Sequence, residues 1–174
     1  MFCERRFFWL LAIVLVVSVA ALVGCGKKES GEKVAENMME KTLERATGEK
    51  TDVDVEGENV TITTPSGSVE MKETGEWPSD MFSDVPRFTY GTVERVSKGT
   101  EGGMKKFNIY LRDVSDDAID KYGADMKAAG WEAQSTMQSD EGGMVSAQKG
   151  NIALQVIYNK TDKTAVVIAF STSE

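Results

Sequence analysis

Apolar and polar residues change their spacing several times along the chain, and each change predicts a different kind of element. Residues 7–23 form an almost continuous apolar run that is broken only by Ser18. In residues 32–47 apolar positions recur at helical spacing, and from residue 53 onward most of them alternate with polar positions. The pattern therefore predicts an N-terminal apolar segment, one helix, and then a mainly β-structured chain.

The first predicted module spans residues 32–73 and consists of a helix followed by a small β-meander. The residues expected on the buried face of the helix are Val34, Met38, Leu43 and Ala46, with most glutamates on the other side. Residues 53–55 and 60–62 alternate around Gly57-Glu58-Asn59, which predicts a hairpin. Val69 and Met71 predict a third short strand after the turn at residues 65–67.

A segment rich in proline and aromatic residues, 74–90, separates this module from the next. It contains Trp77, Phe82, Phe88 and Tyr90, which are too apolar for a freely solvated tether. We therefore expect a linker that packs against one of its neighbours.

The second module, residues 91–174, is predicted as an antiparallel sheet of order β-β-α-β-β-β with one helix on one face, so the fold class is α+β. Phe107, Ile109 and Leu111 alternate with polar residues and are expected to face a helix at residues 116–129. Ile119, Tyr122, Met126 and Ala129 form the apolar stripe of that helix. Gly130 and Trp131 predict a Schellman end, in which the tryptophan folds back on Met126.

The end of the N-terminal apolar run carries the most specific motif, Leu22-Val23-Gly24-Cys25. Arg5 and Arg6 precede the run, and its 17 residues are fewer than the roughly 20 that a spanning helix requires. This segment resembles the lipobox of bacterial lipoproteins. The resemblance implies that residues 1–24 are a signal peptide, that Cys25 receives a diacylglycerol group on its sulfur, and that cleavage occurs just before this cysteine.

The same resemblance implies a place in the cell envelope, with the membrane as a partner through the lipid on Cys25. Gly26 stands where aspartate usually signals inner-membrane retention. This implies the outer membrane facing the periplasm in a Gram-negative cell, or the outer face of the cell membrane in a Gram-positive one. Residues 25–31 are predicted as a tether. Lys27 and Lys28 lie beside the anchor, where anionic headgroups favour each positive charge by ~1 kcal/mol.

Charge is distributed unevenly along the chain, whose formal net charge is −8. Residues 31–84 hold 14 acids and five bases, whereas residues 85–174 hold 12 acids and 11 bases. Such a chain is repelled by nucleic acid, and it has no basic stripe with interleaved aromatic residues. We therefore expect no nucleic-acid partner, and we expect the acidic half to be repelled from anionic lipid.

The candidate catalytic and metal motifs have simpler structural explanations. The chain contains no histidine, and Cys25 is assigned to lipid, so neither residue is available as a base or nucleophile. Asp52, Asp54 and Glu56 begin like a calcium loop, but Thr63 occupies the position of its bidentate glutamate, so we read them as solvated strand residues. Asp113, Asp116 and Asp117 are explained by helix capping. No catalytic residue, cofactor or metal site is predicted.

The strongest candidate for recognition is the sheet face opposite the second helix. Tyr110 and Arg112 are expected there, joined by Gln155, Ile157 and Val167 from the last two strands. Aromatic and arginine side chains are enriched at interfaces. The alternative is that the N-terminal helix or the 77–90 segment covers this face.

The function expected from the sequence is a membrane-anchored, non-enzymatic binding or interaction module, with a protein or an envelope polymer as its possible partner. The alternatives are a carboxylate-based hydrolase of the cell envelope and a structural or stress-related envelope protein.

Overall fold

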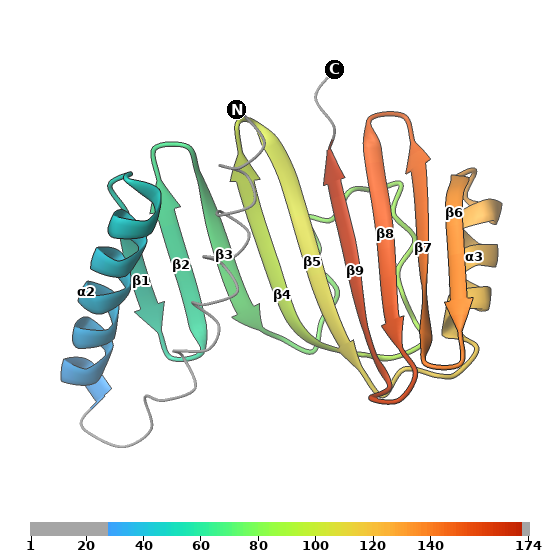
Figure 1. Cartoon of the computed structure of the whole chain (residues 1–174), viewed down its shortest axis with the longest axis horizontal. Coiled ribbons are helices and arrows are strands. Elements are labelled where there is room, and N and C mark those ends of the chain that lie inside the picture. Colours follow the sequence, from blue (N-terminus) through green and yellow to red (C-terminus); the bar gives the residue numbers. More distant parts are fainter. Residues whose placement is uncertain (1–27, 172–174) are drawn as a thin grey trace. The chain divides into compact units, whose positions relative to one another are not determined.

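The computed structural model describes residues 28–171, so the predicted signal peptide and Cys25 lie outside the described residues (Figure 1). The described chain is α+β, with two helices and antiparallel strands, as the sequence predicts. The full chain divides into two compact units at Ser68 and Val69, so the described parts of these units are residues 28–68 and 69–171. The division falls inside β3 (Gly67–Glu73), before the predicted linker at residues 74–90. Neither helix of the described chain is long and apolar enough to cross a membrane.

In the first unit, helix α2 (Lys28–Thr47) precedes a hairpin of β1 (Asp52–Glu56) and β2 (Asn59–Thr64). The helix begins inside the stretch predicted as a tether, because residues 28–31 are already helical. It ends at Gly48, where φ is 73° and the N–H donates to the carbonyl of Glu44 at 2.8 Å. The predicted hairpin is confirmed, with Val53 opposite Ile62 in antiparallel register.

The buried face of α2 differs from the predicted one. Met39 and Leu43 form a small core with Val53, and Val55, Val60 and Ile62 pack against it. Val34 and Met38 are instead 59% and 66% exposed. The helix carries apolar pairs on two faces, so its own periodicity could not decide which pair meets the hairpin.

Three glutamates of α2 explain which face turns inward. They lie one turn apart, and each side chain accepts a hydrogen bond from a backbone N–H of the β1 segment. The pairs are Glu36 with Val55 (3.1 Å), Glu40 with Val53 (3.3 Å) and Glu44 with Thr51 (3.3 Å). β1 is the first strand in the sheet order, and within residues 28–171 no strand pairs with its outer edge to accept these bonds. The glutamates therefore close the edge of the strand.

The described part of the second unit begins in β3 and continues with six further strands and one helix (Figure 1). In chain order these elements are β4 (Thr92–Glu101), β5 (Met104–Arg112), α3 (Ala118–Ala128), β6 (Glu132–Ser139), β7 (Gly142–Lys149), β8 (Ile152–Asn159) and β9 (Thr164–Ser171). The spatial order is β3-β4-β5-β9-β8-β7-β6. Every pair from β4 to β6 in this order is antiparallel.

Four strands follow α3. The sequence pattern predicts all four, at residues 131–139, 144–149, 152–158 and 164–171, so the predicted order β-β-α-β-β-β counts one strand too few. The chain passes from β5 through α3 to the far edge of the sheet and then returns strand by strand. β9 therefore pairs with β5, a long-range contact that the local pattern does not reveal.

Helix α3 packs on the side of the sheet that the sequence predicts. Phe107, Ile109 and Leu111 are at most 3% exposed and share one core with Ile119, Tyr122 and Met126 of the helix. Val167 also lies on this side, because it pairs with Ile109 and is fully buried. Its predicted place on the opposite face is therefore wrong. Both alternating sets of β9 are apolar, so the pattern did not distinguish them.

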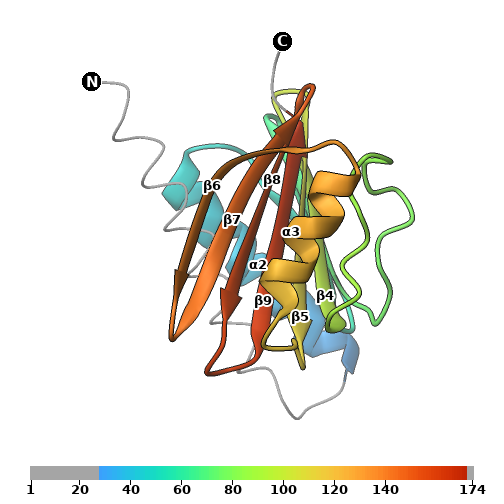
Figure 2. The ribbon, with the colours of Figure 1, turned by 90° about the vertical axis from the view of Figure 1, so that its right-hand side faces the viewer.

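The 74–90 segment belongs to the core of the second unit. Val85 and Phe88 are buried in it, and Phe82 meets Phe107 edge to face at 5.4 Å between ring centroids. Tyr122 Oη donates to the Pro86 carbonyl at 2.7 Å. Figure 2 shows this segment on the same side of the sheet as α3. The expectation that the segment packs is confirmed, and it is not a spacer between modules.

Candidate functional site

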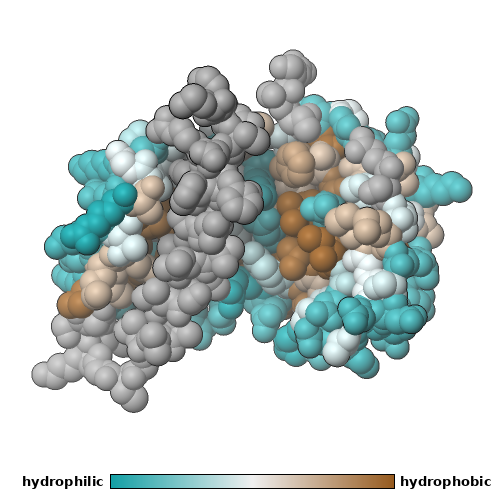
Figure 3. Space-filling view, in the orientation of Figure 1, coloured by the Kyte–Doolittle hydropathy of each residue, from teal (hydrophilic) through white to brown (hydrophobic). Residues whose placement is uncertain are grey.

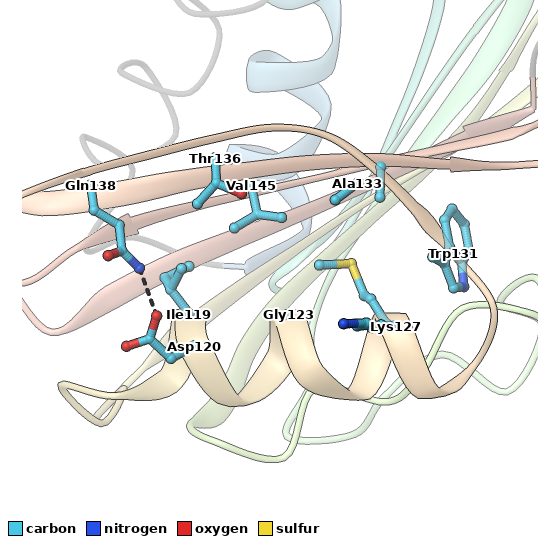
Figure 4. Close-up of a pocket in the computed structure, with 11 residues that line it drawn as sticks. Ile119, Asp120, Gly123, Lys127, Trp131, Ala133, Thr136, Gln138 and Val145 are labelled. Carbon is cyan, nitrogen blue, oxygen red and sulfur yellow. Dashed lines mark hydrogen bonds between the residues drawn. The ribbon is translucent and has the colours of Figure 1, made fainter.

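A groove of about 450 Å³ lies between α3 and the strands β6 and β7 (Figure 4). Most of its lining is apolar: Ile119, Met126, Trp131, Ala133, Val145 and Ala147. Small-molecule sites are typically concave, mainly apolar and roughly 300–1,000 Å³ in volume. The groove therefore lies within the volume range of small-molecule sites, and apolar residues make up the larger part of its lining.

The end of α3 positions β6 beside the helix and so forms one wall of the groove. Gly130 has φ 79° and its N–H donates to the carbonyl of Lys127 at 3.1 Å, while the N–H of Trp131 donates to that of Met126 at 3.0 Å. These bonds confirm the predicted Schellman end. The Trp131 indole N–H donates to the Asp84 carbonyl at 2.9 Å, which fixes the ring at the end of the groove.

Gly123 widens the middle of the groove. It lies inside α3 and lines the groove between the two helix turns that carry Ile119 and Lys127 (Figure 4). A glycine inside a helix is less favourable than alanine by about 1 kcal/mol. A Cβ atom at this position would meet nothing within 4 Å, so close packing does not explain the glycine. A long side chain here would instead occupy the groove.

Polar groups lie toward the two ends of the groove. Toward one end, Gln138 Nε2 donates to Asp120 Oδ1 at 2.8 Å, and toward the other Lys127 lies near Trp131 (Figure 4). Asp120 is the one acid among the residues that line the groove. The groove thus brings no second carboxylate to Asp120, and it gives the hydrolase alternative no catalytic pair.

Sequence reasoning missed this groove. It assigned Ile119 and Met126 to the core, and both are indeed buried, but their outer edges also line the groove. The available signal was Gly123, a glycine in the middle of a predicted helix with no turn to explain it. The second wall comes from β6, the element that follows α3, and from β7, and the chain must turn back after the helix before either strand lies against it.

The predicted recognition surface lies on the opposite face of the same sheet. Tyr110 is opposite Val166, which is opposite Ile157, so the three side chains form one row across β5, β9 and β8. Arg112 lies two residues after Tyr110 in β5, so its side chain points to the same face. Gln155 lies two residues before Ile157 in β8, opposite Ile168, and also points to this face. The structure therefore brings together all four candidate residues, Tyr110, Arg112, Gln155 and Ile157.

This open face is more apolar than the sequence suggested. β9 contributes Val166, Ile168 and Phe170 to it, because its smaller residues, Ala165 and Ala169, face the core with Val167. Tyr110, Ile157 and Phe170 are 37%, 43% and 36% exposed. Figure 3 shows an apolar patch over the second unit on this face. The 74–90 segment does not cover the patch, because it packs in the core on the α3 side.

Two of the polar residues on the open face, Arg112 and Gln155, have side-chain partners within the chain. Arg112 Nη1 lies 2.6 Å from Asp113 Oδ2, and Gln155 Nε2 donates to Met144 Sδ at 3.1 Å. The Arg95 guanidinium lies over the Tyr110 ring, 6.0 Å from its centroid. These contacts hold the polar rim in place around the apolar side chains.

The acids weighed as metal ligands lie on an ordinary strand. Asp52, Asp54 and Glu56 alternate along β1 and are all exposed, which fits solvated strand residues. Within residues 28–171 no group of three histidine, cysteine, aspartate or glutamate side chains could hold a metal ion.

Residues 93–171 match the START domain-like family. The matched range runs from the second residue of β4 to the end of β9 and so includes the whole lining of the groove. No curated protein and no solved structure gave a significant match to the chain. The likeness to this family is compatible with a ligand-binding module and favours binding over catalysis.

Proposed function

We propose that this protein is a lipid-anchored, non-enzymatic binding protein that holds a small apolar ligand in the groove between α3 and the β6–β7 hairpin. The observation that carries the proposal is the apolar groove itself, which lies entirely within the range similar to the START domain-like family. Burial of apolar ligand surface contributes roughly 25 cal/mol per Å², so the lining supplies the main source of affinity.

The ends of the groove restrict the chemistry of the ligand. Between its two ends the lining is mainly apolar, with Thr136 as the one hydrogen-bonding side chain, so it suits an aliphatic or aromatic body. Lys127 at the rim suits an anionic or strongly polar end group, since its ammonium is exposed and can remain hydrated. An amphipathic ligand with one polar end therefore fits the groove.

Filling the groove tests this proposal. The apolar anionic dye 1-anilinonaphthalene-8-sulfonate serves as the probe, and its fluorescence is titrated against the purified protein. We expect Gly123→Leu to weaken dye binding by about tenfold or more, the loss of ~1.4 kcal/mol. Gly123→Ala is the matched control, because its Cβ meets no atom within 4 Å and should leave the dye affinity nearly unchanged.

A Gly123→Leu variant that binds the dye as tightly as the parent would contradict the proposal. Unfolding in urea shows whether each variant keeps its fold. The dye could also bind the open sheet face, and Ile157→Ser on that face separates the two sites because it leaves the groove intact.

The anchor is tested separately from the groove. The motif Leu22-Val23-Gly24-Cys25 supports cleavage before Cys25 and acylation of its sulfur. Cys25→Ser should leave the precursor uncleaved and without acyl chains, because the hydroxyl cannot replace the sulfur as acceptor. Mass spectrometry of the purified parent and variant checks this, and a parent chain that begins elsewhere or lacks acyl chains on Cys25 would contradict it.

A second candidate function is the binding of a protein partner on the open sheet face. It is favoured by the exposure of Tyr110, Ile157 and Phe170 on one apolar patch with a polar rim. Interfaces commonly have this arrangement of an apolar centre and a polar border.

A further inference from the structure

Helix α2 separates its charges by sign. Over residues 32–47 all four glutamates are half-buried, and three of them bond the β1 segment. The three basic residues, Lys33, Lys41 and Arg45, are all exposed. None of these bases forms an ion pair with a side chain of the described residues. Over residues 32–47, where four acids stand against three bases, the charged side chains in the exposed class are therefore all basic.

The same surface carries two large apolar side chains. Val34 and Met38 are 59% and 66% exposed, and a helical repeat of 3.6 residues places them among the bases. The exposed residues over 32–47 are Lys33, Val34, Asn37, Met38, Lys41, Thr42, Arg45 and Ala46. We call these eight residues the outer face of α2. It includes no acid.

We propose that the outer face of α2 lies on an anionic membrane surface. Helices that bind in the plane of a membrane combine apolar residues with lysine and arginine in this way. The charge is complementary to anionic headgroups, and Met38 and Val34 can enter the headgroup boundary. The inference rests in part on the proposed anchor, because a lipid on Cys25 would lie three residues before the first residue of α2, Lys28.

The proposal replaces the expectation that the acidic half of the chain is repelled from anionic lipid. Three of the four acids over residues 32–47 accept hydrogen bonds from backbone N–H groups at residues 51–55, so these three are turned away from the outer face of α2. Each basic residue near an anionic membrane strengthens binding by about fivefold at low ionic strength. The three bases together are therefore expected to contribute on the order of 100-fold.

The experiment uses the mature protein with Met38→Cys, labelled at this thiol with a solvent-sensitive fluorophore. The parent protein, treated with the same fluorophore, is the labelling control. If the anchor is correct, it should take up no label, because Cys3 is removed with the signal peptide and Cys25 is acylated. We expect a blue shift of the label on vesicles of phosphatidylcholine with phosphatidylglycerol, reversed by high salt, and little shift on phosphatidylcholine alone. Glu58→Cys, exposed in the β1–β2 turn, should show no such shift.

Charge reversal provides the matched comparison. Lys33→Glu, Lys41→Glu and Arg45→Glu together should abolish the shift of the label at position 38. The control reverses three exposed bases of the second unit, Lys105, Lys106 and Lys160, and changes the net charge by the same amount. This control should keep the shift.

Equal shifts on the two kinds of vesicle, no shift on either, or equal loss in both triple variants would overturn the proposal. Flotation with phosphatidylcholine vesicles reports the anchor independently of α2. If the protein floats with phosphatidylcholine vesicles but the label does not shift on anionic vesicles, the membrane contact of the outer face is refuted and the lipid anchor is supported. If the label shifts on anionic vesicles but the protein does not float with phosphatidylcholine vesicles, the lipid anchor is refuted and the membrane contact of the outer face is supported.

Discussion

The two helices of this protein are held to their strands by different interactions. Helix α3 buries Ala118, Ile119, Tyr122 and Met126 in the main core of the second unit. Helix α2 buries only Met39 and Leu43 among residues 32–47, and three glutamates on its inner side bond the N–H groups of the β1 segment. Apolar burial specifies α3, whereas α2 is specified largely by the strand edge that it closes. A helix of the second kind keeps an outer face available for another contact.

The largest effect is expected where α3 enters the core. Ile119→Ala removes a side chain that is 5% exposed, and such changes destabilise by ~2–5 kcal/mol through lost burial and the cavity left behind. Urea unfolding of the second unit measures the loss. A loss below ~0.5 kcal/mol, as at surface sites, would show that α3 does not hold its unit together.

A smaller effect is expected for the corresponding change in α2. Leu43→Ala should cost ~2 kcal/mol, near the lower end for such substitutions, because its core contains few residues and can collapse around the gap. Amide exchange should quicken in β1 and β2 and stay unchanged in the β5 amides. Faster exchange throughout the second unit would contradict this separation.

Removing the glutamate side chains tests the other interaction. Glu36→Ala, Glu40→Ala and Glu44→Ala together should cost ~1–2 kcal/mol, because each bond is 3.1–3.3 Å long and only partly buried. The N–H groups of Thr51, Val53 and Val55 should exchange faster with solvent. Glutamine at the same three positions keeps an acceptor oxygen and serves as the control, which should retain most of the protection.

Alkaline pH should lower the free energy of unfolding of the second unit through Tyr122 of α3. Burial, and then the nearby charge of Asp125, raise the pKa of Tyr122 above its usual value of 10. The folded state therefore binds this proton more tightly than the unfolded state. The contribution of this proton to the free energy of unfolding is fully present below pH 10. As the pH rises from 10 toward the raised pKa of Tyr122, the contribution falls by ~1.4 kcal/mol per pH unit. Tyr122→Phe should lack this component and cost ~1 kcal/mol at pH 7 through loss of its bond to Pro86. If the melting temperatures of the parent and of Tyr122→Phe fell in parallel above pH 10, the assignment of this pH dependence to Tyr122 would be refuted.

The smallest effect on stability is expected on the open sheet face. Tyr110→Ala combined with Arg112→Ala should change the free energy of unfolding by less than ~0.5 kcal/mol, since both side chains are exposed. If this face binds a protein partner, the double variant should lose it in a pulldown from crosslinked envelopes. A melting temperature several degrees lower with the same partners captured would instead make the face intramolecular packing.

Much of the local structure could be read from the sequence. The hairpin of β1 and β2 follows from alternating valines around a glycine turn. The Schellman end at Gly130 and the burial of Phe107, Ile109 and Leu111 beneath α3 were also predicted correctly. These features depend on neighbouring residues or on strict alternation within one strand, so a local pattern contains them.

The groove and the buried face of α2 could not be read in the same way. The groove requires the β6–β7 hairpin to lie against α3, and this contact forms only when the helix and the hairpin pack together in the folded chain. In the sequence, the lining residues of α3 form an ordinary apolar helix stripe. They become part of a groove only when β6 and β7 form the opposite wall. The face of α2 depends on the free edge of β1, which attracts Glu36, Glu40 and Glu44 and so turns Met39 inward and Met38 outward.

The sequence by itself determined where most helices and strands lie, and which residues share a face within each strand. Only the tertiary structure decided which of two apolar faces turns inward. In β9 the inner positions are Ala165, Val167 and Ala169, while the larger Val166, Ile168 and Phe170 face outward. The aromatic rings of Phe107, Phe88 and Tyr122 already fill the core on the inner side. At the density of a protein interior only the smaller set fits there, and the larger set makes the opposite face apolar.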